Sequence, residues 1–150
     1  MFYGKNSGKF GVNFRNNLIM FKTILFPIEL TREAREAIQL TADMVKTHQS
    51  KLTILSVVET NNKGVMSSEA QVAKLLQEAK SFFAERGISA ETIEREGIPA
   101  FTICDIADEI NADLIIMGCR GLGLIDEEAA ADSVTNRVIN LASCPVLVTT

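Results

Sequence analysis

Leu114-Ile115-Ile116-Met117 is a continuous apolar run, and the glycine-rich sequence Gly118-Cys119-Arg120-Gly121-Leu122-Gly123 follows it directly. A short apolar run bounded by turn residues is typical of a strand that is buried on both faces, as in a parallel sheet. A helical pattern begins after the glycines, at about Ser133, and runs to about Ala142. We therefore predict a strand, a glycine-rich turn and a helix in this part of the chain.

The same alternation of strand and helix extends on both sides of this segment. Further apolar runs predict strands over residues 23–28, 52–58 and 145–148, and the alternating segment 90–96 predicts a more exposed strand near a sheet edge. Helices are expected from a cap at Thr31, from Ser68 to before Gly87, and from Pro99 to about Asn111. The order βαβαβαβαβ predicts an α/β fold with an open, five-stranded parallel sheet and helices on both faces, because parallel strands need helical crossovers. In such sheets ligands bind beyond the carboxyl ends of the strands, here after the first and fourth strands.

Composition narrows the classes of function. The chain has 150 residues, a net charge of −4 and 47% hydrophobic residues, which indicates one globular domain and argues against nucleic acid as a partner. No apolar run has the ~20 residues of a membrane helix, so we expect no membrane association and a cytoplasmic location. Residues 1–20 follow neither period and are expected to form a flexible extension before a domain over residues 21–150, with Met20 as an alternative start.

Cysteine and histidine residues are few. The three cysteines are odd in number and lack C-x-x-C spacing, which argues against a disulfide framework or a zinc site. Cys104 and Cys144 are expected to be small buried side chains. The single histidine, His48, is expected at a solvated helix end, where the helix dipole favours it. Cys119 is kept as a candidate reactive thiol, because Arg120 is adjacent. We predict no catalytic residues and no metal site.

The glycine-rich turn is the candidate position for any ligand-binding chemistry of the chain. Glycines allow close approach to a ligand, and a helix N-terminus offers free N–H groups to a phosphate. The turn is not a Walker A loop, because no Gly-Lys-Ser/Thr follows, and Asp126 stands where a dinucleotide fingerprint needs its third glycine. A turn that only joins strand to helix remains the alternative.

Taken as a whole, residues 21–149 resemble the universal stress protein family. The resemblance rests on five pieces in order: Ile24 to Glu29, Ser56 to Glu59, Gly97-Ile98-Pro99, Ala112 to Gly118, and Cys144 to Val148. It implies a Rossmann-like sheet of the type found in adenine nucleotide alpha hydrolases. It also implies a homodimer paired through the last strand (Val146, Leu147, Val148), and the apolar edge of that strand favours the same pairing. Many members bind ATP or AMP, and few are efficient enzymes, so at most weak ATP hydrolysis is expected.

The resemblance also implies a nucleotide site. The family pattern G-x2-G-x9-G-[S/T] is met in the degenerate form G-x2-G-x10-D-S, in which the loop is one residue longer and Asp132 replaces a glycine. The site residues implied are Pro27, Ile28, Glu29 and Val57 at the adenine and ribose end, with Met117, Gly118, Arg120, Gly121, Ser133, Val134 and Thr135 around the phosphates. Glu29 stands where nucleotide-binding members carry aspartate.

Asp132 divides the functional hypotheses. As the helix N-cap it would accept the N–H groups that a phosphate needs, and its charge would repel the phosphate by roughly 0.7 to 2.8 kcal/mol at ~6 Å. One hypothesis is a stress-response or signalling module that binds ATP or AMP, with or without Mg²⁺. The alternative is a dimeric protein-interaction module without nucleotide and with an unknown protein partner. Nucleotide-transferring enzymes are disfavoured, because neither Ser-Gly-Gly-x-Asp-Ser nor His-x-Gly-His occurs.

Overall fold

The computed structural model describes residues 20–28, 32–59, 69–118 and 133–149. Strands and helices alternate through this part of the chain. In order they are β1 (Thr23–Pro27), α2 (Arg32–His48), β2 (Lys51–Val58), α3 (Glu69–Ala84), β3 (Ala90–Glu96), α4 (Pro99–Glu109), β4 (Leu114–Gly118), α6 (Val134–Leu141) and β5 (Val146–Thr149). Each of these elements falls on a segment for which the sequence predicts the same type of structure.

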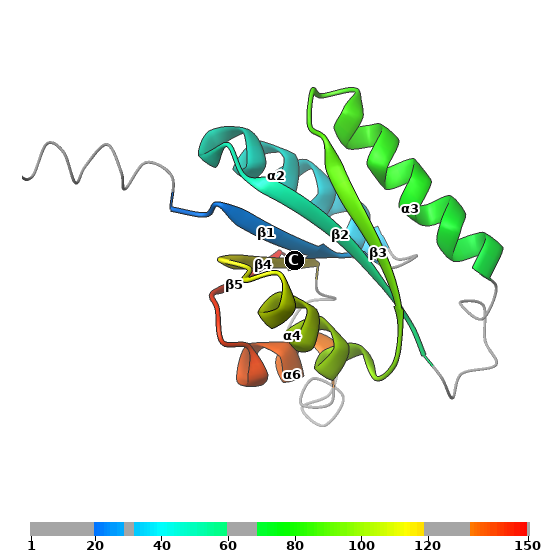
Figure 1. Cartoon of the computed structure of the whole chain (residues 1–150), viewed down its shortest axis with the longest axis vertical. Helices are drawn as coiled ribbons and strands as arrows, with labels where there is room; N and C mark the ends of the chain where they lie inside the picture. The colour runs from blue at the N-terminus through cyan, green and yellow to red at the C-terminus, as the bar shows by residue number, and fades with distance from the viewer. Residues whose placement is uncertain (1–19, 29–31, 60–68, 119–132, 150) are drawn as a thin grey trace, which may run out of the picture.

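The five strands form one parallel sheet in the order β3-β2-β1-β4-β5. Helices α2 and α3 cover one face, and α4 and α6 cover the other (Figure 1). Two layers of helices on a parallel sheet leave the strands buried, which is why β1, β2 and β4 consist mostly of apolar residues. The predicted α/β fold class is confirmed.

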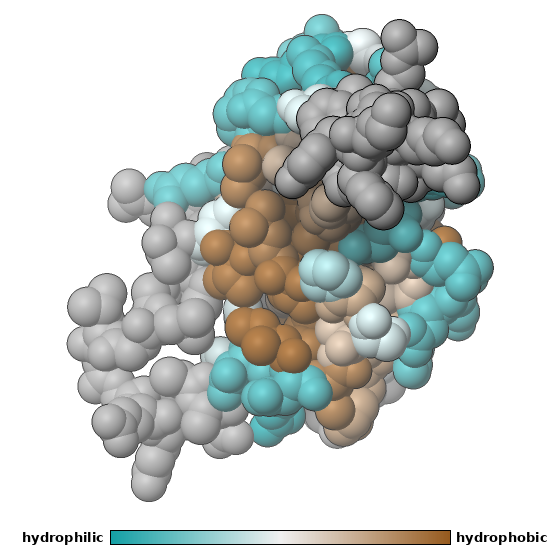
Figure 2. Space-filling model, turned by 90° about the vertical axis from the view of Figure 1, so that its left-hand side faces the viewer, coloured by the Kyte–Doolittle hydropathy of each residue, from teal (hydrophilic) through white to brown (hydrophobic). Residues whose placement is uncertain are grey.

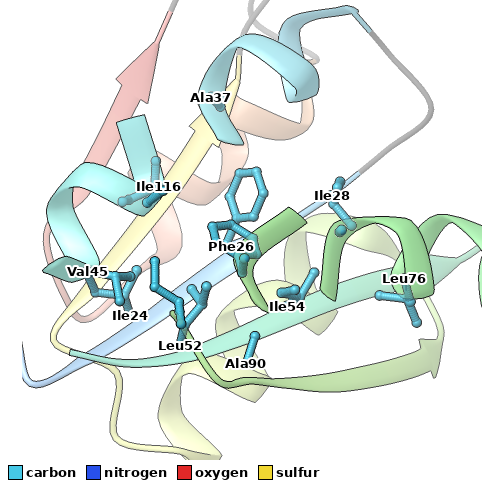
Figure 3. Close-up of a cluster of buried hydrophobic side chains, with 14 of the residues drawn as sticks. Ile24, Phe26, Ile28, Ala37, Val45, Leu52, Ile54, Leu76, Ala90 and Ile116 are labelled. Atoms are coloured by element: carbon cyan, nitrogen blue, oxygen red, sulfur yellow. The ribbon is translucent and has the colours of Figure 1, made fainter. Parts of the chain in front are cut away.

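Two hydrophobic cores lie on opposite faces of the sheet, because successive strand residues point to opposite sides. Ile24 and Phe26 of β1 join the core under α2 and α3, whereas Leu25 joins the core under α4 and α6. Figure 3 shows side chains from β1, β2 and β4 converging with those of α2 and α3 in the first core. Phe26 is fully buried there and makes an edge-to-face contact with Phe83 of α3 at 6.2 Å between ring centroids. Burial of such a side chain contributes about 1.5–3 kcal/mol.

The two edge strands differ in chemistry. In β3 only Ala90 is buried and Ile93 half-buried, so its predicted edge position is confirmed. Its exposed charges pair with neighbours, Lys51 with Glu91 at 3.2 Å and Arg95 with Glu109 at 3.4 Å. Charges along an edge disfavour pairing with another strand. The opposite edge, β5, reads Val-Leu-Val-Thr and has no charged residue.

Two local expectations need correction. The N-cap of α6 is Ser133 and not Asp132, because the Ser133 hydroxyl accepts the N–H of Asn136 at 3.1 Å; Asp132 itself lies outside the described residues. His48 does end α2, but it is half-buried and its ring packs edge-on against Phe21 at 5.0 Å. A neighbour that is distant in sequence, just before β1, therefore covers a ring that was expected in solvent.

Some predictions from the sequence concern segments that lie outside the described residues. Residues 1–19, the cap at Thr31, the start of a helix at Ser68, and Cys119 lie outside the described residues. None of the helices in the described ranges is both long and apolar enough to cross a membrane.

Candidate functional site

The topology places a candidate site at the carboxyl ends of β1 and β4. β1 is hydrogen-bonded to β2 on one side and to β4 on the other. The helix that follows β1 in the chain, α2, covers one face of the sheet, and the helix that follows β4, α6, covers the opposite face (Figure 1). The chain therefore diverges between two neighbouring strands, and open α/β sheets bind ligands at such a switch point.

The end of β1 supplies the first predicted site residues. Pro27 is half-buried and is the last residue of the strand. Ile28 is 6% exposed, and its N–H donates to the carbonyl oxygen of Leu55 at 2.8 Å. The backbone thus follows β2 for one residue beyond the strand, which fixes where the chain leaves the sheet. Glu29, the next predicted residue, lies outside the described residues.

Three predicted residues form an apolar support beside this point. Met117 of β4 is 5% exposed, and Val57 of β2 and Val134 of α6 are half-buried. All three pack in the core under α4 and α6. The structure therefore brings together residues from three elements that are up to 77 positions apart in the chain, and their role is to hold β4 and α6 in place at the switch point.

The start of α6 is the polar part of the candidate site. Ser133 has extended backbone angles (φ −62°, ψ 145°), and the helix begins at Val134. In an α-helix the first N–H groups have no partner inside the helix, and the helix dipole places partial positive charge there. Thr135 is 6% exposed, so its side chain supports the helix from within. Gly118 ends β4, while Arg120 and Gly121 lie outside the described residues.

Thr149 is a candidate residue that the sequence interpretation missed. It is the last residue of β5 and lies opposite Gly118 in the register of the two strands. Its Oγ1 is buried and has no hydrogen-bond partner among the described residues. A buried hydroxyl without a partner is costly unless a ligand or water completes it. The signal that could have found it is the expected parallel pairing of the fourth and fifth strands.

The ionisable groups of the described residues offer little for acid–base or metal chemistry. No group of three or more His, Cys, Asp or Glu side chains within residues 20–28, 32–59, 69–118 and 133–149 could hold a metal ion. His48 contacts Phe21, which precedes β1, so it lies at the amino end of the sheet and not at the carboxyl end. The site as described is suited to binding through backbone N–H groups and apolar contacts.

Comparisons with known proteins agree with this architecture. The model of the universal stress protein family matches residues 20–150. Universal stress protein Sll1654 of Synechocystis is 58% identical over 151 residues, which cover 97% of this chain and 90% of that protein. Among solved structures, a universal stress protein in complex with cAMP superposes with a TM-score of 0.73 at 20% identity, covering 87% of this chain and 98% of that one. The Archaeoglobus fulgidus universal stress protein in complex with dAMP gives a TM-score of 0.68 at 19% identity, with coverage of 87% and 99%. The chain therefore belongs to the universal stress protein family.

Proposed function

We propose that this protein is a stress-response module that binds an adenine nucleotide at the carboxyl ends of β1 and β4. The observation that carries the proposal is the capped N-terminus of α6, which follows the switch point and provides N–H groups for a phosphate. Two structurally similar family members, solved with cAMP and with dAMP, support the choice of adenine nucleotides. AMP and ATP share the adenosine and phosphate groups of these ligands.

We propose two kinds of contact with the ligand: apolar contacts to the adenosine and hydrogen bonds to a phosphate. The half-buried Pro27 and Val57 are suited to the adenine and ribose end, and the amides of Val134 and Thr135 to a phosphate. The Ile28 side chain, in contrast, is buried in the core on the other face of the sheet from Val57. Thr149 Oγ1 is a further polar group at the same edge. Because the cap is Ser133, its hydroxyl accepts the N–H of Asn136, and the amides of Val134 and Thr135 make no hydrogen bond to another residue in the described ranges.

We propose that Mg²⁺ accompanies ATP and is not required for nucleotide binding itself. Mg²⁺ prefers carboxylate and phosphate oxygens and keeps several waters, so it would reach this protein bound to the phosphates of ATP. The acidic residues Asp126, Glu127, Glu128 and Asp132 lie outside the described residues. Binding of AMP, which carries a single phosphate, does not depend on the ion in this proposal.

The test is a calorimetric titration with AMP, adenosine and ATP, the last with and without Mg²⁺, on two variants matched at Ser133. Asn and Asp both cap helices about as well as Ser, so Ser133→Asn and Ser133→Asp are expected to leave the stability of α6 nearly unchanged. Ser133→Asp adds a negative charge where the phosphate is proposed to bind. A like charge at ~6 Å costs about 2.8 kcal/mol at an effective dielectric of 20, or roughly a hundredfold in affinity.

We expect AMP to bind the wild type and Ser133→Asn, and to bind Ser133→Asp at least tenfold more weakly. Adenosine should bind all three proteins with similar affinity, because it has no phosphate. If millimolar nucleotide gave no heat of binding and no thermal stabilisation, the proposal would be contradicted. Equal affinity of AMP for the two variants would place the phosphate elsewhere.

The second candidate function is a dimeric protein-interaction module, and the β5 edge favours it. Val146 packs against one core and Leu147 against the other, whereas Val148 packs against neither among the described residues. On α6, Ile139 and Leu141 are 43% and 48% exposed. Figure 2 shows a hydrophobic area near the centre of the face that it presents. An uncharged edge strand beside exposed apolar side chains is suited to pairing with the same strand of a second copy.

Substitution of Val148 by Lys tests this pairing. A lysine on an edge strand blocks strand addition and, at Val148, removes little internal packing. Light scattering at micromolar concentration should give twice the chain mass for the wild type and the chain mass for Val148→Lys. Thr92→Lys, on the opposite edge strand β3, is the matched control and should keep the dimer mass. A monomeric wild type would contradict the pairing.

We also propose that the protein binds nucleotide without turning it over. The position of His48 at the amino end of the sheet supports this, since a general base must lie within hydrogen-bond reach of the reacting group. Product analysis after prolonged incubation with ATP and Mg²⁺ is expected to show at most a trace of hydrolysis. A rate above that of a typical slow enzyme, about 1 s⁻¹, would contradict the proposal.

A further inference from the structure

Two cysteines that are distant in sequence lie on segments that a hydrogen bond joins, α4 and the connection between α6 and β5. Cys104 lies in α4, and Cys144 lies in the short connection between α6 and β5. Both are free, both are half-buried, and both pack against the core under α4 and α6. Neither takes part in the proposed nucleotide site, which lies at the carboxyl ends of the strands.

A hydrogen bond fixes the connection against α4. The Ser143 hydroxyl donates to Oδ1 of Asp108, which lies one helical turn after Cys104. Residues four apart in a helix have Cβ atoms about 5–6 Å from each other on the same face. Cys144, the neighbour of Ser143, is thereby held next to the helix face that carries Cys104.

The electrostatics of the two thiols agree with this placement. Burial and then the carboxylate of Asp108 raise the pKa of both Cys104 and Cys144. Cys144 also contributes to the raised pKa of Cys104. Asp108 therefore lies near both thiols, which agrees with the hydrogen bond that holds Ser143, and with it Cys144, against this face of α4.

We propose that Cys104 and Cys144 are a redox-sensitive pair that a hydroperoxide converts into an intramolecular disulfide. One thiolate attacks the peroxide, so that an S–O bond forms, the O–O bond breaks and hydroxide or an alkoxide leaves. The second thiolate attacks the resulting sulfenic acid; the S–S bond forms, the S–O bond breaks, and hydroxide leaves and takes up a proton released by the thiols to give water. Overall, the two thiols lose two hydrogen atoms. Hydrogen peroxide is reduced to two molecules of water, and an organic hydroperoxide is reduced to water and an alcohol.

The raised pKa values of the two thiols limit the rate of this reaction, and the position of the disulfide decides its structural effect. Because the thiolate is the reactive form, raised pKa values keep the pair reduced at neutral pH until the oxidant is strong or prolonged. The disulfide joins α4 to the start of β5 and closes the loop between residues 104 and 144. It therefore restrains the edge strand β5 relative to α4, independently of any nucleotide.

The test uses Cys119→Ser, so that Cys104 and Cys144 are the only thiols. The protein is treated with hydrogen peroxide and examined by intact mass and peptide mapping without reductant. We expect a monomer that has lost two hydrogens, a linked peptide pair containing Cys104 and Cys144, and reversal by dithiothreitol. The thermal midpoint should rise on oxidation and return on reduction, since the cross-link restricts the unfolded chain.

Matched variants separate this reaction from general oxidation. Cys104→Ser and Cys144→Ser, each in the Cys119→Ser background, should gain oxygen atoms and never lose two hydrogens. Asp108→Asn keeps the Oδ1 acceptor for Ser143 but removes the charge, so it should speed oxidation severalfold. The charge of Asp105 helps to raise the pKa of Cys104 but not that of Cys144. Asp105→Asn should therefore speed oxidation less than Asp108→Asn does. Oxygen addition alone, or a disulfide-linked dimer, in folded Cys119→Ser protein would overturn the proposal.

Discussion

At the scale of single residues, Gly97 is a position that leaves no room for a side chain. Its N–H donates to the carbonyl oxygen of Val58 at 3.0 Å, which holds the backbone at the end of β3. A Cβ atom built on Gly97 would collide with Oγ1 of Thr102, a buried side chain of α4. The Gly97-Ile98-Pro99 segment therefore needs glycine because the first turn of α4 lies directly against it.

Gly97→Ala is expected to cost about 1–3 kcal/mol, as overpacking does in other cores. At this chain length that lowers the thermal midpoint by about 2–4 °C for each kcal/mol. Removal of the colliding hydroxyl in the double variant with Thr102→Ala should recover part of the loss. Gly87→Ala is the control, since a Cβ there meets no atom within 4 Å and suffers only from a φ of +75°. Equal recovery of Gly87→Ala by Thr102→Ala would contradict the collision.

The two half-buried thiols give stability a defined dependence on pH. Burial and Asp108 raise the pKa of Cys104 and Cys144 above the ordinary value of 9.0, so the folded state holds these protons more strongly than the unfolded chain does. The resulting stabilisation is present below pH 9.0 and is lost as pH rises through the raised folded-state values. Urea unfolding between about pH 8 and pH 10 should show a smaller loss in Cys104→Ser/Cys144→Ser than in the wild type. Parallel curves for the two proteins would exclude this contribution.

At the scale of elements, the strands could be predicted because burial imposes a pattern on their residues. Leu114–Met117 is apolar throughout, and Leu52–Val58 is apolar except for Thr53 and Ser56, because helices cover both faces. Ala90–Glu96 is largely charged and exposed because β3 lies at the edge. Gly87, with φ +75°, follows α3 as a glycine after a helix commonly does. Such signals are local, so the sequence alone carries them.

What could not be predicted depends on contacts between distant segments. Asp and Ser cap helices almost equally well, so the sequence could not decide between Asp132 and Ser133; the structure selects Ser133. Two features depend on strand order: the Phe21 ring beside His48, and the Thr149 hydroxyl beside Gly118, which has no hydrogen-bond partner in the described part of the chain. For the candidate site, the structure brings Val57, Met117 and Val134 together and adds Thr149, which the sequence interpretation missed. Their part in binding stays a prediction, as does that of Glu29, Arg120 and Gly121.

At the scale of the whole molecule, one sheet serves two cores. Ile54 of β2 is fully buried under α2 and α3, and Ile106 of α4 is buried in the core on the other face. The strands cannot keep one face ordered while losing the other, because each strand contributes alternate residues to both. The two cores should therefore unfold together, as small single domains usually do.

Ile54→Val and Ile106→Val test this coupling with the same chemical change on opposite faces. Each removes one buried methylene and is expected to cost about 0.5–1.5 kcal/mol. Calorimetry should show one transition in each variant, shifted to lower temperature, and the double variant should shift by about the sum. Ile139→Val, at a position that is 43% exposed, is the control and should change the midpoint little.

Because the chain has no tryptophan, far-ultraviolet circular dichroism is the second probe. Two separate transitions, or probes that do not coincide, would mean that the layer of α4 and α6, which carries the proposed phosphate contacts, can open while the other core stays folded.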